Sequence, residues 1–447
     1  MSSQDFLFDR SEFERTNIPA EANAVGGTPR LRHAVRDQYI VLPGTIDDLL
    51  AADHQARLVW KFVCGLELSP LLSQIDAVEG HVGRSATDPR ILLTLWLYAT
   101  IEGVGSARAL DRLCESHATY QWIAGGVSLN YHTLSDFRTR HETFLDQMLA
   151  NSVATLMHAG VVELQQVAQD GMRVRASAGQ SSFRRQPKLQ DCLRQAQQQV
   201  AALKAELDAD PAAGSARERA ARERAAAERV ARVEQALEEL ARLDAAKTPK
   251  EQEKTKVSTT DPQARTMKMG DGGFRPAYNV QFAVDTSAQV IVGVDVTTRG
   301  TDKGEMLRMH QQVCERYQRT PQRWLADGDF AVRADIEQLH AAGTIAYTPP
   351  KKPHNLKREL DAPRPDDSAV LQEWRQRMGT PEVQAIYRQR ASSVECVNAH
   401  ARNRNLKQFT VRGLAKVRAV VLWQALVQNI LRIFKLLPLA AAQTPAT

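Results

Sequence analysis

Three acidic residues, Asp170, Asp327 and Glu395, lie where their carboxylates could hold divalent metal ions. Asp170 follows an apolar stretch that begins at Val161, Asp327 ends the short apolar segment QRWLAD, and Glu395 lies in a later, helical segment. Open α/β sheets place ligands at the ends of their strands. Carboxylates that bridge two metal ions about 3.5–4 Å apart activate both the attacking and the leaving oxygen of a phosphodiester. Because the set contains no Cys or His, the expected metal is magnesium or manganese.

Glu395 lies in a strongly basic segment, in which it is the only acidic residue between Tyr387 and Arg418. In a regular helix Arg388, Glu395 and Arg402 would share one face, because they are spaced seven residues apart. Such a cluster of cations attracts phosphate. The alternative is a solvated helix with an internal ion pair. We predict DNA contacts for the basic residues of this segment: Arg388, Arg390, Arg402, Arg404, Lys407 and Arg412.

The composition is that of a soluble globular protein, with 447 residues, 43% hydrophobic and 25% charged. A formal net charge of +6 and a pI of about 9.1 favour a polyanionic partner. The five cysteines are far apart and include no C-x-x-C pair, which argues against a disulfide framework or a cysteine zinc site. The longest apolar run, Ile91 to Ile101, is too short to span a membrane. We expect a cytoplasmic protein without a membrane partner.

The first part of the chain is predicted to be an arm, residues 1–50, followed by a helical domain, residues 51–160. Asp88-Pro89 opens an apolar helix, and Ser106 opens a second one. After Gly125-Gly126, the segment NYHTLSDFRTRHETFLDQMLANSVATLM continues as a helix. Two helices around a short connection resemble a helix-turn-helix, which would place Arg138 and Arg140 near DNA. A helical bundle without DNA contacts remains the alternative.

The second part, residues 161–437, combines strand and helix patterns and predicts an α/β fold. YNVQFAVDT and QVIVGVDVT read as adjacent strands of a covered sheet, followed by alternating helices and short strands. Residues 183–256 interrupt this pattern with two heptad-like segments, which predict a helical hairpin insertion. Its RERAARERAAAER stretch balances Arg against Glu. We therefore interpret the hairpin as solvated, with a possible self-association surface and no nucleic-acid patch.

The chain resembles bacterial insertion-sequence transposases of the DDE type from about Asp53 to Ile433. The resemblance rests on EGHVGRSATDPRILLTLWLYATIEGVGSARAL, NYHTLSDFR, VAQDGMRVRASAGQSSFRR, TTDPQARTMKMGDGGFRPAYNVQFAVDT, LADGDF and YRQRASSVECVNAHARNRNLKQFTVRGLAKVRA. It implies a ribonuclease-H-like catalytic core preceded by an all-α domain that binds transposon ends. In that core Asp170, Asp327 and Glu395 would be the catalytic and metal-binding triad, holding two divalent ions, magnesium or manganese.

Two features depart from the family pattern. The signature usually has three residues between its Arg and its Glu, whereas Arg390 and Glu395 are separated by four, which leaves the role of Arg390 open. Asp329 follows the second Asp and is a spare carboxylate near it. Three further acidic residues are also candidates for the site: Asp285, Asp295 and Asp302.

The resemblance predicts DNA transposition. Water activated between two metals would cleave at the ends of the element, and the resulting 3′-hydroxyl would attack target DNA. The partners would be double-stranded DNA, both terminal inverted repeats and target, and further copies of the chain in a homodimer or higher oligomer. The protein would then be nucleoid-associated in a bacterium. Two alternatives are a non-catalytic DNA-binding protein derived from a transposase and a metal-dependent nuclease that does not join strands.

Overall fold

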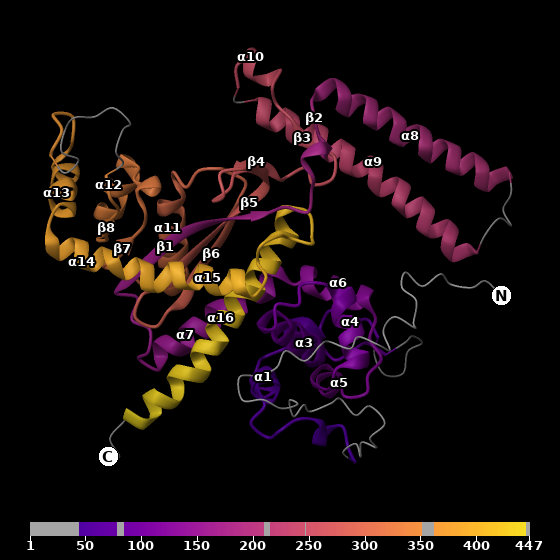
Figure 1. Cartoon of the computed structure of the whole chain (residues 1–447), viewed down its shortest axis with the longest axis horizontal. Helices are drawn as coiled ribbons and strands as arrows, with labels where there is room; N and C mark the ends of the chain where they lie inside the picture. The colour runs from indigo at the N-terminus through magenta and orange to yellow at the C-terminus, as the bar shows by residue number, and fades with distance from the viewer. Residues whose placement is uncertain (1–43, 78–84, 210–214, 246, 351–361, 444–447) are drawn as a thin grey trace, which may run out of the picture. The chain divides into compact units, whose positions relative to one another are not determined.

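The computed structural model describes residues 44–77, 85–209, 215–245, 247–350 and 362–443 (Figure 1). The chain divides into two compact units, residues 1–45 and 46–447, and every described helix and strand belongs to the second. Most of the predicted arm, residues 1–50, therefore lies outside the described residues.

The second unit begins with helices, as predicted. They are α1 (Gln55–Cys64), α2 (Ser69–Leu72), α3 (Pro89–Ile101), α4 (Ala107–Ser116), α5 (Ala118–Ala124), α6 (Tyr131–Arg140) and α7 (Glu142–His158). Helix α3 begins where predicted, because the Asp88 side chain accepts a hydrogen bond from the Arg90 amide at 2.8 Å. Eleven of its thirteen residues are buried, so α3 is the centre of this helical part.

The helix-turn-helix prediction is wrong in its connection. A third helix, α5, lies between α4 and α6, and it ends at Gly125, whose φ of 58° is left-handed. The long helix predicted after Gly126 is broken at His141, whose φ of −106° and ψ of 41° are not helical. The region is thus a helical bundle in which α6 packs against α4, α3 and α16 (Leu414–Gln443).

A mixed sheet follows and confirms the predicted α/β core. Its strands are β1 (Gln166–Arg175), β4 (Arg265–Lys268), β5 (Phe274–Asp285), β6 (Val290–Thr297), β7 (Arg323–Leu325) and β8 (Ile345–Tyr347). The order across the main sheet is β6-β5-β1-β7-β8, with β4 also paired to β5. Strand β5 is antiparallel to β1 and β6, whereas β7 is parallel to β1 and β8. This combination of order and direction is the ribonuclease-H-like topology.

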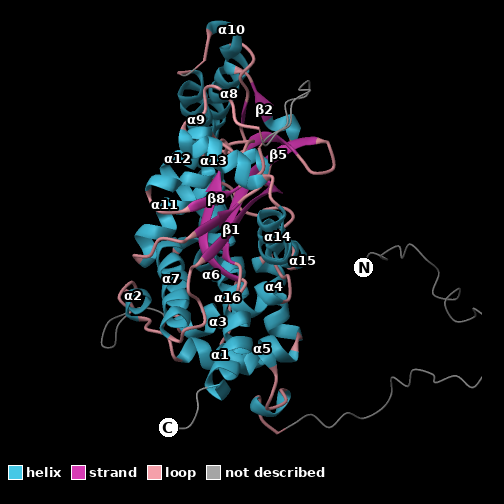
Figure 2. Cartoon of the chain, turned by 90° about the vertical axis from the view of Figure 1, so that its left-hand side faces the viewer, coloured by secondary structure: helices cyan, strands magenta, loops and turns pink. Residues whose placement is uncertain are grey.

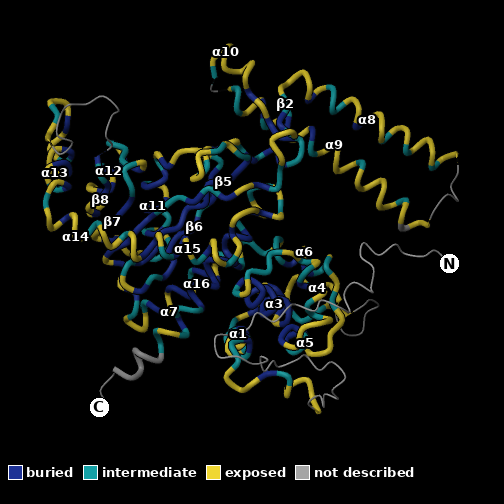
Figure 3. The backbone as a smooth tube through the Cα atoms, in the orientation of Figure 1, coloured by how far each residue is buried: buried dark blue, intermediate teal, exposed yellow. Residues whose placement is uncertain are grey.

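Helices cover both faces of the sheet (Figure 2). Helix α11 (Glu305–Tyr317) lies on one face, and α14 (Pro381–Arg390) and α15 (Cys396–Asn403) lie on the other. Helices α12 (Arg333–Ala341) and α13 (Ala369–Met378) pack near β8. By length and composition, Leu414–Leu437 of α16 could cross a membrane, but 67% of its most apolar window is buried in the protein, as in a core helix (Figure 3).

The predicted hairpin is present as α8 (Gln186–Ala209) and α9 (Ala216–Asp244), followed by α10 (Pro249–Gln252). Strands β2 (Phe183–Arg184) and β3 (Val257–Ser258) pair at its base, so the chain leaves the core and returns at one place. The hairpin has a small apolar cluster of its own, formed by Leu189, Ala236, Leu240 and Val257. Most of its remaining surface is exposed, which agrees with the predicted solvated helices (Figure 3).

A buried polar network lies under β1 on the α11 side. The Asp302 side chain is 2% exposed; its Oδ1 accepts hydrogen bonds from Asn279 Nδ2 and Gln281 Nε2, both at 2.7 Å. Its Oδ2 accepts one from Arg173 Nη2 at 2.8 Å. Gly171 makes room for this carboxylate, since a Cβ atom there would overlap Asp302 Oδ1 and Gln281 Nε2. The residue after Asp170 is therefore glycine for lack of space, and not for a turn.

The tight space at Gly171 yields a stability prediction. Gly171→Ala should lower the free energy of unfolding by about 1–3 kcal/mol, because a well-packed network must shift to admit the methyl group. Gly270→Ala is the matched control, since nothing lies within 4 Å of a Cβ atom there. Urea denaturation of both variants measures the difference. Equal urea midpoints for Gly171→Ala and wild type would show that the space at Gly171 admits a methyl group without cost.

Candidate active site

The register of two parallel strands brings Asp170 and Asp327 to the same level of the sheet. Ala168 of β1 pairs with Leu325, the last residue of β7. Asp170 lies two residues after Ala168, and Asp327 lies two residues after Leu325, so the two are at the same level on adjacent segments of the sheet. Asp327 then begins a 3₁₀ turn, where its Oδ1 accepts a hydrogen bond from the Asp329 amide at 2.8 Å. Local capping thus holds Asp327 at the strand end.

Glu395 ends a π-helical turn, Ala391–Glu395, that joins α14 to α15. An α-helix places residues four apart on one face, whereas a π turn does this for residues five apart. The extra residue between Arg390 and Glu395 is therefore absorbed by the turn, and the two side chains still meet, with Nη2 and Oε1 2.7 Å apart. Arg388, Glu395 and Arg402 were predicted to share one face of a regular α-helix. The π turn between Arg388 and Glu395 changes the angle between their side chains about the helix axis, so this prediction does not hold as stated.

Arg390 contacts two of the three acidic residues. Its Nη1 lies 3.3 Å from Asp170 Oδ1, in addition to the Glu395 contact. The Arg390 side chain is 13% exposed and Asp170 is 19% exposed, so water screens the pair only partly. Glu395 is 47% exposed and lies at the open side of the site. Arg390 thus supplies positive charge between carboxylates that would otherwise repel one another.

Asn398 is a site residue that the sequence prediction missed. Its Nδ2 donates a hydrogen bond to Asp170 Oδ2 at 2.9 Å, and its side chain is 2% exposed. Its Oδ1 atom is buried and has no hydrogen-bond partner among the described residues. The available signal was its position three residues after Glu395, which places both side chains on neighbouring parts of one helix. Only the packing of α15 on β1 shows that Asp170 is its target.

The environment of Asp170 disfavours its negatively charged form. Burial, together with the negative charges of Asp327 and Glu395, raises its pKa to about 6, although Arg390 lowers it. Burial also raises the pKa of Asp327. For Arg390, burial alone would lower the pKa, but the charges of Asp170, Tyr387 and Glu395 raise it. The site therefore holds more negative charge than its one arginine neutralises.

The other acidic candidates are engaged elsewhere. Asp285 accepts hydrogen bonds from Ser287 and Ala288 in the β5–β6 turn. Asp295 pairs with Arg308 at 2.8 Å. Asp302 is saturated by the network under β1 and faces away from Asp170, because neighbouring strand residues point to opposite faces. The charges of Asp302 and Asp329 nevertheless act on Asp327 and, together with its burial, raise its pKa.

The predicted DNA-contacting residues differ in accessibility. Five are exposed: Arg388, Arg402, Lys407, Arg412 and Arg140. Arg404 is partly buried and donates a hydrogen bond to Gln428 Oε1 at 3.1 Å.

Arg138 is partly buried and is held by contacts within the protein. It donates hydrogen bonds to the Gly105 carbonyl and to Thr410 Oγ1, and it stacks on the Trp96 ring at 4.7 Å. Burial lowers its pKa to about 10. We therefore omit Arg138 from the proposed DNA contacts.

The carboxylates suit a hard divalent cation by their chemistry. Among the described residues, no group of three or more His, Cys, Asp or Glu side chains is arranged to hold a metal ion. The three carboxylates are nevertheless oxygen ligands of the kind that such an ion takes, and the raised pKa of Asp170 reflects its burial together with the nearby negative charges, which a cation would neutralise. The residues fit such an ion, and the guanidinium of Arg390 meets part of that charge in this structure.

Two family models match the chain. One, described as a transposase DDE domain, matches residues 244–430, and the other, described as a transposase domain (DUF772), matches residues 44–140. The chain belongs to the insertion-sequence DDE transposases. The DDE match contains Asp327 and Glu395, whereas Asp170 of this transposase lies before it, separated by the hairpin. Searches of curated proteins and of solved structures found no match.

The raised pKa of Asp170 predicts how stability depends on pH. Its value of about 6 lies above the usual 3.8. Between these values the folded transposase binds more protons than the unfolded chain, so the free energy of unfolding falls as pH rises. Without metal, at about pH 8, Asp170→Asn should be more stable than wild type by on the order of 1–3 kcal/mol. Below about pH 4 the advantage should disappear.

Chemical denaturation in a chelator at both pH values measures this effect. Asp208→Asn, at an exposed position on α8, is the control. If the difference in free energy of unfolding between Asp170→Asn and wild type were the same at both pH values, the raised pKa of Asp170 would be contradicted.

Proposed function

We propose that this transposase cuts DNA at the ends of its element and joins the resulting 3′-hydroxyl to target DNA. The observation that carries this proposal is the convergence of Asp170, Asp327 and Glu395 from three separate elements onto one site of surplus negative charge. We assign the three as catalytic metal ligands. Two magnesium or manganese ions, when bound, would activate the attacking oxygen and stabilise the leaving oxygen.

The protein residues around the triad have distinct proposed roles. Asn398 orients Asp170 through its hydrogen bond at 2.9 Å. Arg390 holds Glu395 toward the sheet through Nη2, and its Nη1 lies 3.3 Å from Asp170 Oδ1, so it links two members of the triad. The two residues act on the carboxylates from the α14–α15 side, so a single helical element organises the site.

Double-stranded DNA is the proposed partner, both as terminal inverted repeats and as target. The exposed cations Arg388, Arg402 and Lys407 flank Glu395 or follow it closely in sequence. Side chains of this type contact the phosphate backbone and position the duplex. We also propose that pairing of two ends requires a homodimer or a higher oligomer, acting at the nucleoid.

A nuclease that cuts without joining is the second candidate. The same carboxylates would serve hydrolysis, since the first step uses water as the attacking group. Joined products therefore separate the two functions. A non-catalytic DNA-binding protein is disfavoured, because all three acidic residues are present and electrostatically coupled.

Neutralising the triad tests the proposed chemistry. Asp170→Asn, Asp327→Asn and Glu395→Gln should each abolish cleavage of a donor plasmid carrying the element's ends, because an amide cannot hold the metal ions. DNA binding should be largely retained, which a gel-shift assay would measure. Asp285→Asn is a buried-acid control outside the site and should keep cleavage if it folds.

Each outcome of this experiment bears on a stated role. Near-normal cleavage by one triad variant would remove that residue from the triad. Cut ends without joined products, from a wild-type protein supplied with target DNA, would favour the nuclease.

A further inference from the structure

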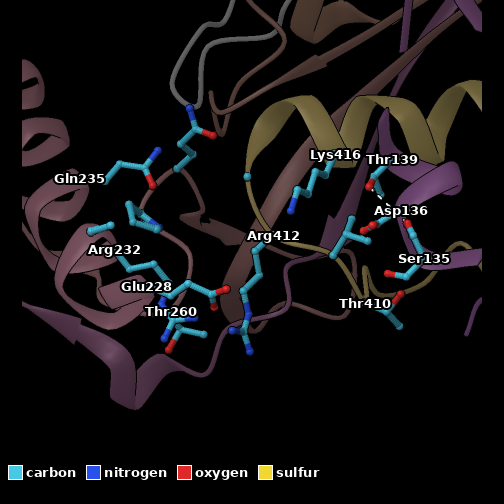
Figure 4. Close-up of a pocket in the computed structure, with 15 residues that line it drawn as sticks. Ser135, Asp136, Thr139, Glu228, Arg232, Gln235, Thr260, Thr410, Arg412 and Lys416 are labelled. Atoms are coloured by element: carbon cyan, nitrogen blue, oxygen red, sulfur yellow. Dashed lines mark hydrogen bonds between the residues drawn. The ribbon is translucent and has the colours of Figure 1, made fainter. Parts of the chain in front are cut away.

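A groove of about 760 Å³ lies away from the triad, between parts of the chain that are distant in sequence. One wall is α6, with Ser135 and Thr139, and the opposite wall is α9, with Glu228 and Arg232. Figure 4 shows Arg412 extending between these walls, with Lys416 beside it. The helical part and the hairpin insertion thus meet around one open space.

Two cations in this groove have no partner among the described residues, and a third makes a single side-chain hydrogen bond. Arg232 and Lys416 make no side-chain hydrogen bond or ion pair with any described residue, and Arg412 donates only to the Ser177 carbonyl, at 3.3 Å. Elsewhere on the hairpin, arginines are engaged. Arg222 pairs with Glu206 at 2.8 Å, and Arg229 donates to Gln199 at 2.6 Å. The groove therefore keeps positive charge available for a ligand.

The remaining lining residues suit a phosphate backbone better than a protein. Hydroxyl groups of Ser135 and Thr260 face the groove, and hydroxyls together with Arg and Lys are common partners of phosphate oxygens. None of the described lining residues is aromatic, although aromatic anchors dominate protein interfaces. Two acids are present: Asp136 is paired with Arg140 at 2.9 Å, whereas Glu228 has no ion-pair partner among the described residues.

The groove is connected to the active site by the basic segment. The part of the basic segment that follows α15 begins after Asn403. It runs beside the end of β1, where the Phe409 amide donates to the Arg175 carbonyl at 2.8 Å. It reaches the groove at Arg412. Exposed cations, Lys407 among them, lie along this path. Exposed cations therefore lie between the triad and the hairpin, where a duplex bound at the triad could extend.

We propose that this groove is a second DNA site, which binds the sugar–phosphate backbone of double-stranded DNA through Arg232, Arg412 and Lys416. The inference rests on the proposed function, because it extends the DNA path beyond the triad. It also gives the hairpin a role that its balanced charge does not indicate. The hairpin insertion would contact DNA through Arg232 on one wall of the groove, and the helical part would contact it through α6 on the opposite wall.

Paired variants of α9 test the proposal with opposite signs. Arg232→Gln should weaken binding to a short fluorescent duplex of arbitrary sequence and reduce the salt slope of binding by about one, because one phosphate contact is lost. Glu228→Gln should tighten binding, because it removes a repulsive charge. Arg224→Gln is the matched control on the same helix, since the Arg224 side chain donates to the Ala220 carbonyl one turn earlier and lies outside the groove.

Fluorescence anisotropy over a range of salt concentrations measures affinity and slope, and circular dichroism checks the fold. Opposite changes for Arg232→Gln and Glu228→Gln, with Arg224→Gln unchanged, support the site, since a loss of stability cannot tighten binding. Equal effects of Arg232→Gln and Arg224→Gln would overturn the second site while leaving the proposed function intact. Absence of DNA binding by the wild-type protein would overturn both.

Discussion

Repulsion among carboxylates is the constraint on which this structure depends. Asp170, Asp327 and Glu395 come from a strand, a strand end and a helix; burial raises the pKa of Asp170 and of Asp327, and at Asp170 the charges of Asp327 and Glu395 add to this effect. Arg390 offsets part of it by contacting two of the three. Under the proposed function this negative charge would be neutralised by divalent cations, so the destabilisation would belong to the function.

The scaffold holds these charges by rigid elements on both faces of one sheet. On one face, the Asp302 network joins β1 and β5 through buried hydrogen bonds and requires glycine at position 171. On the other face, the α14–α15 element carries Arg390, Glu395 and Asn398. The π turn in that element compensates for the extra residue in the signature, so a departure in spacing leaves the geometry of the contact intact.

The hairpin is inserted between β1 and β5 without disturbing their pairing, because β2 and β3 close its base. That position separates Asp170 from the rest of the catalytic domain in sequence, and the DDE match begins only after it. The same insertion brings α9 toward α6 and the basic segment. The tertiary fold thereby turns an apparently peripheral element into one wall of a groove.

Local patterns in the sequence were sufficient for the strands β5 and β6, helix α3 and the hairpin, because alternation, heptads and caps act over a few residues. They failed at the connection between α4 and α6, where the short α5 intervenes. Only the tertiary structure decided which charged side chains are free to bind a ligand. Arg138 is partly buried against Trp96, Arg418 pairs with Glu142, and Asp302 serves a network, whereas Arg232 faces a groove. Each of these outcomes depends on which distant segments pack nearby, and neither composition nor spacing identifies those segments.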